Sequence, residues 1–353
     1  MKNFNLPQAY KAVMYNLFGN PSEVLKTVRL EIPTLQDNEI LVQMHACAIN
    51  PSDLLTIRGR YPDRVEFPKI AGFEGVGTVC VAGNANNNHL IGKRILALKG
   101  KGTWQEYNII PAQEAVLIPD EIDNRTAAQL YINPLTCWLI LVDKLKIDKS
   151  DTLVINAGNS ICGHIIAGFS KSLGFDLISI VRSVENKVKL EQLGLKKVIN
   201  SNEEDITKAI LKFTNNKGVD YALDAIGGDA GATLLKAVNP GGKFLQYGLM
   251  SGQQLPAFFF TDAMEKNVQF EFYHLRDWVY SEPVSYRQQI FKQMIESFVM
   301  ADIKMPIDTE YNIDQIAEAV TIAESEGRNG KILLNFELNT SSDTAEKCMY
   351  YCW

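Results

Sequence analysis

The sequence predicts an α/β protein in which a β-rich N-terminal part precedes a doubly wound parallel sheet with helices on both faces. Between residues 11 and 120, short alternating apolar runs are broken by proline, glycine and asparagine, a pattern typical of β-rich domains. From about residue 151, short apolar runs alternate with amphipathic stretches of helical length. That alternation is typical of a parallel sheet with connecting helices.

The elements of the second part follow one another in a regular order. We expect strands over residues 152–156, 177–181, 197–200, 219–225 and 243–248, and helices over 161–173, 185–193 and 203–213. Two further helices, 286–300 and 313–325, precede a last strand at 331–336. The polar stretch from residue 339 is expected to be frayed.

Composition excludes several classes of function. A chain of 353 residues is long enough for two domains. Its net charge of −6 argues against non-specific nucleic-acid binding, which needs a basic surface. No run reaches the roughly 18 apolar residues of a membrane span, and the first five residues lack the apolar core of a signal peptide. We therefore expect a cytoplasmic protein without a membrane partner, or one in an organellar matrix whose address the sequence does not show.

A glycine-containing turn lies between the first strand of the parallel sheet and its helix, where a dinucleotide-binding turn is expected. The strict Gly-x-Gly-x-x-Gly pattern is absent, because its three positions hold Asn156, Gly158 and Ile161, with Gly163 further on. The helix start would offer backbone N–H groups to a pyrophosphate. The candidate contacts are Asn159, Ser160, Ile161 and Cys162. The alternative is a tight turn that binds nothing.

The end of the second strand bears on the choice of dinucleotide. A site selective for NAD places Asp or Glu there, to bind the ribose 2′-hydroxyl. Here the residues are Arg182 and Ser183. A guanidinium can bind a 2′-phosphate with two oriented hydrogen bonds, so these residues predict NADP(H). The alternative is that Arg182 is a solvated loop charge.

Several short motifs carry a resemblance to a known family. They are Asn-Pro-Ser-Asp at 50–53, Arg-Gly-Arg-Tyr at 58–61, Gly-Phe-Glu-Gly-Val-Gly at 72–77, Gly-Thr-Trp at 102–104, Asn-Pro-Leu-Thr-Cys at 133–137, Asn-Ser at 159–160, Tyr-Gly-Leu-Met at 247–250 and Gly-Lys-Ile-Leu-Leu at 330–334. From residue 11 to about 337 the chain resembles a zinc-free member of the medium-chain dehydrogenase/reductase superfamily. The resemblance is closest to mitochondrial-type 2-enoyl thioester reductases, with quinone oxidoreductases next.

The resemblance implies a Rossmann domain inserted in a GroES-like, β-rich catalytic domain. Its expected parts are residues 1–126 for the N-terminal catalytic part, 127–272 for the Rossmann domain, 273–338 for the C-terminal return and 339–353 for a tail. The active site would lie between the domains, and a homodimer would be usual.

The same resemblance implies roles for individual residues. Tyr61 would be the catalytic proton donor or oxyanion-orienting group, and a phenol suits that role because it stays protonated near neutral pH. Asn50 and Trp104 would line the substrate pocket. The remaining cofactor contacts implied are Asn133, Thr136, Tyr247, Gly248, Leu249, Met250, Phe272, Tyr273, His274, Leu275 and Lys331.

Some of these residues also have structural interpretations. Tyr61 could instead be a loop aromatic packed under Pro62, Trp104 a core residue, and Asn133 a helix cap ahead of Pro134. The alignment around 273–275 is also open, because this chain has an extra residue before Trp278.

No zinc site is expected. Where zinc-dependent members carry a cysteine and a histidine ligand, this chain has Asn50 and Phe73. The four histidines, His45, His89, His164 and His274, show no ligand spacing, and the six cysteines are scattered. Cys348 and Cys352 in the tail remain a possible redox or metal pair. Without a Lewis acid, reduction of an enone or enoyl thioester is favoured over alcohol oxidation, because hydrogen-bond donors suffice for its oxyanion.

The expected function is therefore NADPH-dependent reduction of an activated C=C bond, with a trans-2-enoyl thioester of coenzyme A or acyl carrier protein as substrate. The alternatives are an NADPH:quinone or enone oxidoreductase and, in a different class, a non-catalytic NADP-binding sensor. Arg58, Arg60 and Arg64 around Tyr61 could attract the phosphates of such a thioester or an acidic carrier protein, or form a solvated loop.

Overall fold

The computed structural model describes residues 6–325, 328 and 330–337. Backbone contacts divide the chain into two units, which we call unit 1 and unit 2. Unit 1 contains residues 1–132, 284–291 and 305–353, and unit 2 contains residues 133–283 and 292–304. By backbone contacts the first boundary falls at 132/133, and residues 273–283 and 292–304 belong to unit 2.

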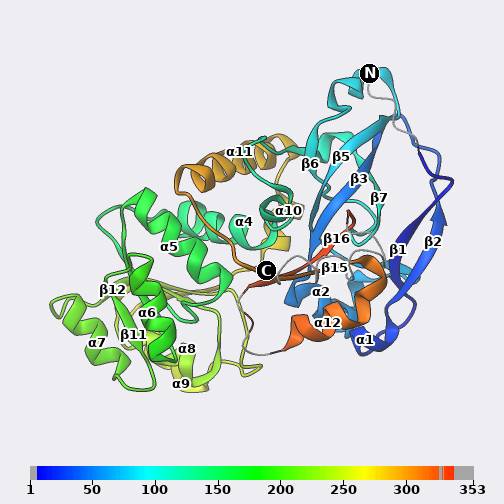
Figure 1. Cartoon of the computed structure of the whole chain (residues 1–353). Coiled ribbons are helices and arrows are strands. Elements are labelled where there is room, and N and C mark those ends of the chain that lie inside the picture. The colour runs from blue at the N-terminus through cyan, green and yellow to red at the C-terminus, as the bar shows by residue number, and fades with distance from the viewer. Residues whose placement is uncertain (1–5, 326–327, 329, 338–353) are drawn as a thin grey trace, which may run out of the picture. The chain divides into compact units, whose positions relative to one another are not determined.

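Unit 1 is the β-rich part, and its sheets are mainly antiparallel (Figure 1). A three-stranded sheet has the order β2-β1-β4, and a seven-stranded sheet has the order β15-β16-β3-β5-β6-β8 with β7 also paired to β3. The strands are β1 (Ala9–Tyr15), β2 (Lys26–Glu31), β3 (Glu39–Ala48), β4 (Lys69–Ile70), β5 (Gly75–Ala82), β6 (Arg94–Leu96), β7 (Tyr107–Pro111), β8 (Val116–Leu117), β15 (Ile307–Tyr311) and β16 (Lys331–Asn335).

Four short helices accompany these strands: α1 (Pro21–Val24), α2 (Pro51–Ile57), α3 (Asn124–Ala127) and α12 (Ile316–Glu324). The core of unit 1 lies between α12 and the sheets, and it includes Ile40, Val42, Trp104 and Val320, all fully buried. The last strand, β16, pairs antiparallel with β3 so that Leu333 faces Ala48. The C-terminal segment therefore returns to the N-terminal sheet.

Unit 2 is built on one six-stranded parallel sheet with the order β11-β10-β9-β12-β13-β14. In chain order its strands are β9 (Thr152–Ile155), β10 (Asp176–Val181), β11 (Val198–Asn200), β12 (Val219–Asp224), β13 (Val238–Gln246) and β14 (Gln269–Phe272). This is the 3-2-1-4-5-6 order of the Rossmann fold, and the strand order reverses between β9 and β12. Ligands of such sheets bind beyond the carboxyl ends of the strands at that point.

The helices of unit 2 are α5 (Ile161–Leu173), α6 (Val184–Gln192), α7 (Ile206–Phe213), α8 (Gly228–Leu235), α9 (Ala257–Glu265) and α10 (Leu275–Ser281). Two helices cross the boundary between the units in sequence, α4 (Ile132–Leu139) and α11 (Val284–Met300). Figure 1 shows α5 to α8 in green around the strands that they connect. No helix in the described ranges is long and apolar enough to cross a membrane.

The predicted elements agree with the observed ones except at a few ends. Helix α5 spans Ile161–Leu173 as predicted, since Ser160 caps its start and Gly174 ends it at a φ of 84°. Helix α7 begins at Ile206, later than the predicted residue 203, because the Asp205 side chain accepts from the N–H of Lys208 and caps the helix there. Strand β13 begins at Val238, ahead of the predicted residue 243, and its pairing with β12 is irregular.

Candidate active site

The predicted site residues of unit 1 include a buried polar network around Asn50. Asn50 follows β3 and is only 1% exposed. Its side-chain amide donates to Glu74 Oε1 at 2.6 Å, and its amide oxygen accepts from the ammonium of Lys331. Asn50 thus connects a buried carboxylate with a buried ammonium, and its amide is already engaged on both sides.

Glu74 also holds the start of helix α4. Its Oε2 accepts from the backbone N–H groups of Tyr131, at 3.1 Å, and Ile132, at 2.8 Å. These are groups that a helix start cannot satisfy from within the helix. A carboxylate there is also favoured by the helix dipole. Asn133 is the second residue of α4 and so is not its cap, because Glu74 supplies the cap from a distant part of the sequence.

Burial perturbs both carboxyl groups near Asn50. Burial raises the pKa of Asp53 from its ordinary value near 3.8 to about 7, although the N–H of Asn50 donates to Asp53 Oδ2 at 2.8 Å and opposes the shift. Burial also raises the pKa of Glu74, while the charge of Lys331 and the N–H donors of α4 lower it. Lys331, expected at the cofactor, is only 5% exposed.

Tyr61 lies in the loop between α2 and β4. It is half-buried and immediately precedes a 3-10 turn at Pro62–Arg64. Gly59 enters this loop at a φ of 81°, and a Cβ there would press on the ring of Phe18 at 3.0 Å. Arg58, one of the three arginines near Tyr61, forms a bidentate ion pair with Glu324 on α12, at 2.8 and 2.9 Å, so its charge is balanced within unit 1.

Trp104, expected as a wall of the substrate pocket, lies in the core of unit 1. The side chain is fully buried, and its indole N–H donates to the carbonyl of Ala48 at 3.3 Å. The ring packs so closely on Gly72 that a Cβ at that glycine would overlap it. The structural interpretation of Trp104 is therefore the one that the structure supports, since a ring with no exposed surface cannot line a pocket.

In unit 2, two glycines allow close packing in the turn after β9, where a dinucleotide is expected. The N–H of Gly158 donates to the carbonyl of Ile180 at 2.9 Å, and a Cβ on Gly158 would overlap Ser179 Oγ. A Cβ on Gly163 would overlap the carbonyl of Gly158, so both glycines are needed for this close approach. The Ser160 hydroxyl accepts from the N–H of Gly163 at 3.1 Å and caps α5.

The first turn of α5 is the expected place for a pyrophosphate. The N–H of His164 donates to the carbonyl of Ser160 at 3.0 Å, which is the first backbone bond of the helix. The N–H groups of Ile161 and Cys162 precede this bond, so no helix carbonyl can accept from them. Asn159 at the tip of the turn is exposed. This arrangement fits a pyrophosphate, which needs N–H donors and the positive end of a helix dipole.

Asn156 and Asp224 connect the two strands at which the strand order reverses. Asn156 follows β9, and its amide donates to Asp224 Oδ1 at 2.6 Å while its oxygen accepts from the N–H of Ala225 at 2.8 Å. Asp224 at the end of β12 is fully buried and also accepts from Gln246 Nε2 at 3.0 Å and the N–H of Gly227 at 3.0 Å. Asp224 was not predicted from the sequence, although a carboxylate at the end of a buried strand is a visible signal.

The end of β10 carries one basic group without an ion pair. Arg182 is exposed, and it forms no ion pair within the part of the chain that the structure describes. Lys187 pairs with Glu204 at 2.8 Å and Lys189 with Glu185 at 2.6 Å. Ser183 caps α6 by accepting from the N–H of Asn186 at 3.2 Å. Arg182 is therefore the cation of this region that can bind a further anion.

Residues of α4 and α5 meet beside the turn. Cys162 Sγ donates to Asn133 Oδ1 at 3.6 Å, and Cys137 Sγ donates to the carbonyl of Cys162 at 3.8 Å. Thr136 on the same helix is half-buried. The structure thus brings Asn133 and Cys162 into contact, and Thr136 lies on the same helix as Asn133.

The loops after β13 and β14 hold the other predicted contacts. The N–H of Tyr247 donates to the carbonyl of Asp224 at 3.0 Å, and the N–H of Met250 to that of Ala225 at 3.0 Å, so this loop is fixed to the end of β12. Gly248 lies between them, and a Cβ on it would lie 2.6 Å from the carbonyl of Ala225. Burial raises the pKa of Tyr247 well above its ordinary value, so its hydroxyl stays protonated.

Exposed apolar side chains mark the same edge. Leu249 is 48%, Met250 69% and Phe272 66% exposed. Tyr273 is buried, and its N–H donates to the carbonyl of Gln246 at 2.8 Å. His274 precedes α10, which begins at Leu275. Among residues 272–275, Phe272 therefore has the most exposed side chain, and Tyr273 is buried within unit 2.

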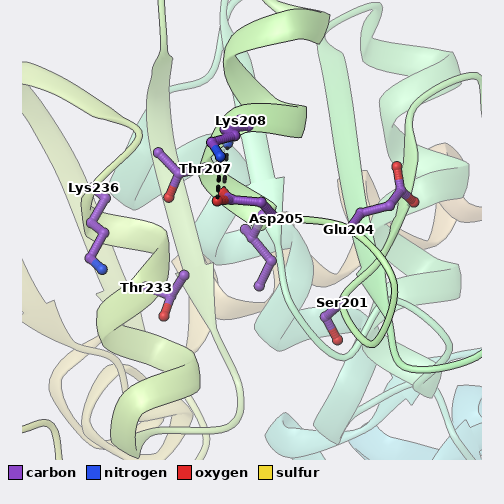
Figure 2. A pocket seen from close by; sticks show the side chains of 8 residues that line it. Ser201, Glu204, Asp205, Thr207, Lys208, Thr233 and Lys236 are labelled. Atoms are coloured by element: carbon purple, nitrogen blue, oxygen red, sulfur yellow. Dashed lines mark hydrogen bonds and ion pairs between the residues drawn. The ribbon is translucent and has the colours of Figure 1, made fainter.

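A separate hollow of about 470 Å³ lies between α7 and α8 (Figure 2). Figure 2 shows Asp205 bonded to Lys208 there, with Thr233 and Lys236 on the neighbouring helix. None of the predicted site residues lines this hollow. It mixes acidic and basic groups and offers no arrangement of nucleophile and base, so the candidate site remains at the carboxyl ends of the strands.

At the two positions where zinc-dependent members carry a cysteine and a histidine, Asn50 and Phe73 offer no thiolate or imidazole. Among the described residues, no group of three or more His, Cys, Asp and Glu side chains is arranged to hold a metal. The amide of Asn50 is engaged by Glu74 and Lys331, and Phe73 offers no donor atom. Cys348 and Cys352 lie outside the described residues.

Comparisons with known proteins agree with this architecture. The profile of the family described as alcohol dehydrogenase GroES-like domain matches residues 36–120, and that described as zinc-binding dehydrogenase matches residues 162–297. The mitochondrial enoyl-[acyl-carrier-protein] reductase of Xenopus tropicalis is 30% identical over 293 residues, which cover 81% of this chain and 83% of that protein.

Solved structures agree as well. A protein of Bacillus thuringiensis, provisionally assigned as an NADPH:quinone reductase, has a TM-score of 0.88 and 37% identity, with 93% of this chain and 99% of that chain covered. A mycobacterial protein complexed with NADPH has the same fold, with a TM-score of 0.80 and 20% identity over 92% of this chain and 99% of that one.

A GroES-like unit combined with a Rossmann unit defines an oxidoreductase of the dinucleotide-binding class. The chain belongs to the medium-chain dehydrogenase/reductase superfamily, in the group that contains mitochondrial enoyl-[acyl-carrier-protein] reductases and NADPH:quinone reductases.

Proposed function

We propose that this chain reduces an activated C=C bond with NADPH, and that its substrate is a trans-2-enoyl thioester of coenzyme A or acyl carrier protein. The observation that carries the proposal is the 30% identity to an enoyl-[acyl-carrier-protein] reductase over 83% of that protein. The site residues support it, because a pyrophosphate fits the turn at Ser160, which caps the start of α5. NADPH, when bound, supplies the hydride that reduces the β-carbon.

The test is a screen of NADPH oxidation with crotonyl thioesters, small enones and small quinones. Higher kcat/KM for the thioester supports the proposal. The second candidate, a quinone reductase, is favoured by the 37% identical protein of Bacillus thuringiensis. It would be chosen if quinones were turned over and thioesters were not. Binding of NADPH without turnover of any acceptor would instead favour the non-catalytic sensor.

Arg182 supports NADPH over NADH. Its guanidinium is exposed, has no ion pair in the described residues, and follows the strand whose end meets the ribose in this fold. We expect Arg182→Ala to weaken NADPH binding by about tenfold or more, as for a lost charge-assisted hydrogen bond, and to leave NADH binding unchanged. Lys189→Ala, which removes a charge already paired with Glu185, is the matched control. Equal binding of both dinucleotides to the unaltered protein would contradict the assignment.

Tyr61 is the proposed proton donor or oxyanion-orienting group. A positioned donor contributes roughly 10²–10⁴-fold to the rate. We therefore expect Tyr61→Phe to lower kcat by at least about 100-fold with little change in NADPH affinity. Tyr280→Phe, an exposed tyrosine on α10, is the control. Unchanged enoyl turnover in the Tyr61 variant would show that another group donates the proton.

Coenzyme A and acyl carrier protein are both acidic carriers, and they make different demands on the protein surface. Arg58 is paired with Glu324, whereas Arg60 is exposed, and we propose Arg60 as a cation that meets the carrier. Comparison of crotonyl-coenzyme A with the crotonyl carrier protein, at low and high salt, separates the two. A carrier protein bound through charge loses affinity as salt rises.

A homodimer is proposed from the family and from an open sheet edge. Strand β14 is the last strand of the parallel sheet, and edge strands are normally covered or charged. Here Phe260, Phe270 and Phe272 form a chain of ring contacts at 5.5 and 4.7 Å, and Phe258 and Met264 on α9 are also exposed. We expect Phe260→Asp to convert a dimer into a monomer in analytical ultracentrifugation. Met300→Asp is the control on an exposed residue of α11.

A further inference from the structure

Two cysteine side chains of unit 2 lie in contact beside the dinucleotide turn. Cys137 is on α4 and Cys162 is the second residue of α5. Cys137 Sγ donates to the carbonyl of Cys162 at 3.8 Å, and Cys162 Sγ lies 3.6 Å from the amide oxygen of Asn133. Asn133 and Cys137 are four residues apart on one helix and so share a face. Both sulfur atoms therefore lie in the same narrow space between α4 and α5.

The surroundings give the two thiols different reactivity. Cys137 is fully buried, and burial raises the pKa of its thiol well above the ordinary value, with the neighbouring thiol of Cys162 adding to the effect. Cys162 is half-buried and is the second residue of α5, so it is the more exposed of the two thiols. Cys162 is thus the thiol that a solution oxidant reaches first, and Cys137 is placed to react with it afterwards.

We propose that Cys137 and Cys162 form a reversible disulfide when a peroxide reaches the dinucleotide turn. In the first step the Cys162 thiolate attacks one peroxide oxygen, the O–O bond breaks, and water leaves after protonation, which leaves Cys162 as a sulfenic acid. In the second step Cys137 sulfur attacks Cys162 sulfur, the S–O bond breaks, and a second water carries away the oxygen with the thiol proton. The peroxide is reduced, and the two thiols are oxidised.

The disulfide would act on the cofactor site, so this consequence rests on the proposed function. Its formation removes the Cys162 thiol from Asn133 and joins α4 to the first turn of α5. That turn carries the predicted pyrophosphate contacts Ser160 and Ile161. We therefore expect the oxidised protein to bind NADPH about fivefold more weakly or worse, the effect of one lost hydrogen bond. Bound NADPH should conversely protect Cys162 from the peroxide.

The test uses the full chain with Cys348→Ser and Cys352→Ser, so that the tail thiols do not contribute. Reduced protein is treated with hydrogen peroxide, with and without NADPH, freed of oxidant and digested without reductant. We expect a peptide pair linked through Cys137 and Cys162, less of it when NADPH is present, and its loss after dithiothreitol. Cys137→Ala should leave Cys162 as a sulfenic acid that dimedone traps. Cys80→Ala, at another buried thiol, is the control and should leave the link intact.

Two outcomes would overturn the proposal. One is a Cys162 that reacts with dimedone in the unaltered protein but never links to Cys137. The other is a link that forms and leaves NADPH affinity unchanged. The peptide map does not depend on turnover, so a failure of the proposed enzymatic function would be recognised separately, by absent NADPH oxidation in protein whose disulfide still forms.

Discussion

Asp53 makes the free energy of unfolding of unit 1 fall as pH rises, which is the opposite of the usual effect of an aspartate. Its carboxyl is 2% exposed, Oδ2 accepts from the N–H of Asn50 at 2.8 Å, and Oδ1 has no hydrogen-bond partner in the described residues. Burial raises its pKa to about 7, against about 3.9 for an aspartate in an unfolded chain. The folded protein therefore holds this proton more tightly than the unfolded chain does.

The size of the effect follows from this difference. Because the folded pKa is the higher one, the stabilisation is complete below about pH 4 and is lost as pH rises to about 7. One pKa unit corresponds to roughly 1.4 kcal/mol, so a difference of about three units corresponds to about 4 kcal/mol of free energy of unfolding. Asp53→Asn keeps an oxygen for the N–H of Asn50 but cannot ionise. Relative to the unaltered protein, this variant should therefore gain about 3 kcal/mol in free energy of unfolding between about pH 5 and pH 8.

The assay is urea unfolding at several pH values, followed by fluorescence and circular dichroism in parallel, so that a two-step transition of the two units is detected. Asp63→Asn, an exposed carboxyl in the loop after Tyr61, is the control and should follow the unaltered protein. Parallel pH curves for the Asp53 variant and the unaltered protein would refute the reasoning, because they would show that Asp53 is ionised throughout or is solvated.

Three further predictions concern other buried groups. Glu74→Gln should destabilise unit 1 by about 3 kcal/mol in urea unfolding, because it removes the buried charge that accepts from the N–H groups of Tyr131 and Ile132 and interacts with the charge of Lys331; equal stability would show that this charge contributes nothing to the fold. Gly158→Ala should abolish NADPH binding in calorimetry, since a Cβ there overlaps Ser179 Oγ. Adding Ser179→Gly should restore part of the binding. If the double variant binds NADPH no better, the overlap is not the cause. Trp104→Ala should lower the free energy of unfolding by about 3–5 kcal/mol and leave NADPH affinity unchanged, as expected for a core residue. A selective rise in the KM for substrate would instead support a role in the pocket.

The sequence predicted features whose causes are local. Helix α5 was predicted to the residue because its cap, Ser160, and its terminating glycine, Gly174, both stand next to it in the chain. The dinucleotide turn was predicted for the same reason. The network of Asn50, Glu74 and Lys331 was not, since Lys331 lies 281 positions from Asn50 and no period or spacing connects them. Tertiary contacts of that kind become visible only when β16 is paired with β3.

These long-range contacts hold the first turn of α4. Ile132 donates its N–H to Glu74, and the next residue, Asn133, accepts from the Cys162 thiol. The buried charges that fix Ile132 are expensive to desolvate, and apolar residues of the same size would often be at least as stable. Their physical benefit is instead orientation. A carboxylate that is bound by two N–H groups and by an amide fixes the direction in which the helix starts. Asn133 follows Ile132 directly in the chain, so Glu74 holds the backbone next to a predicted cofactor contact. Substitutions at Glu74 should therefore alter NADPH binding even in protein that remains folded, whereas substitutions at Trp104 should not.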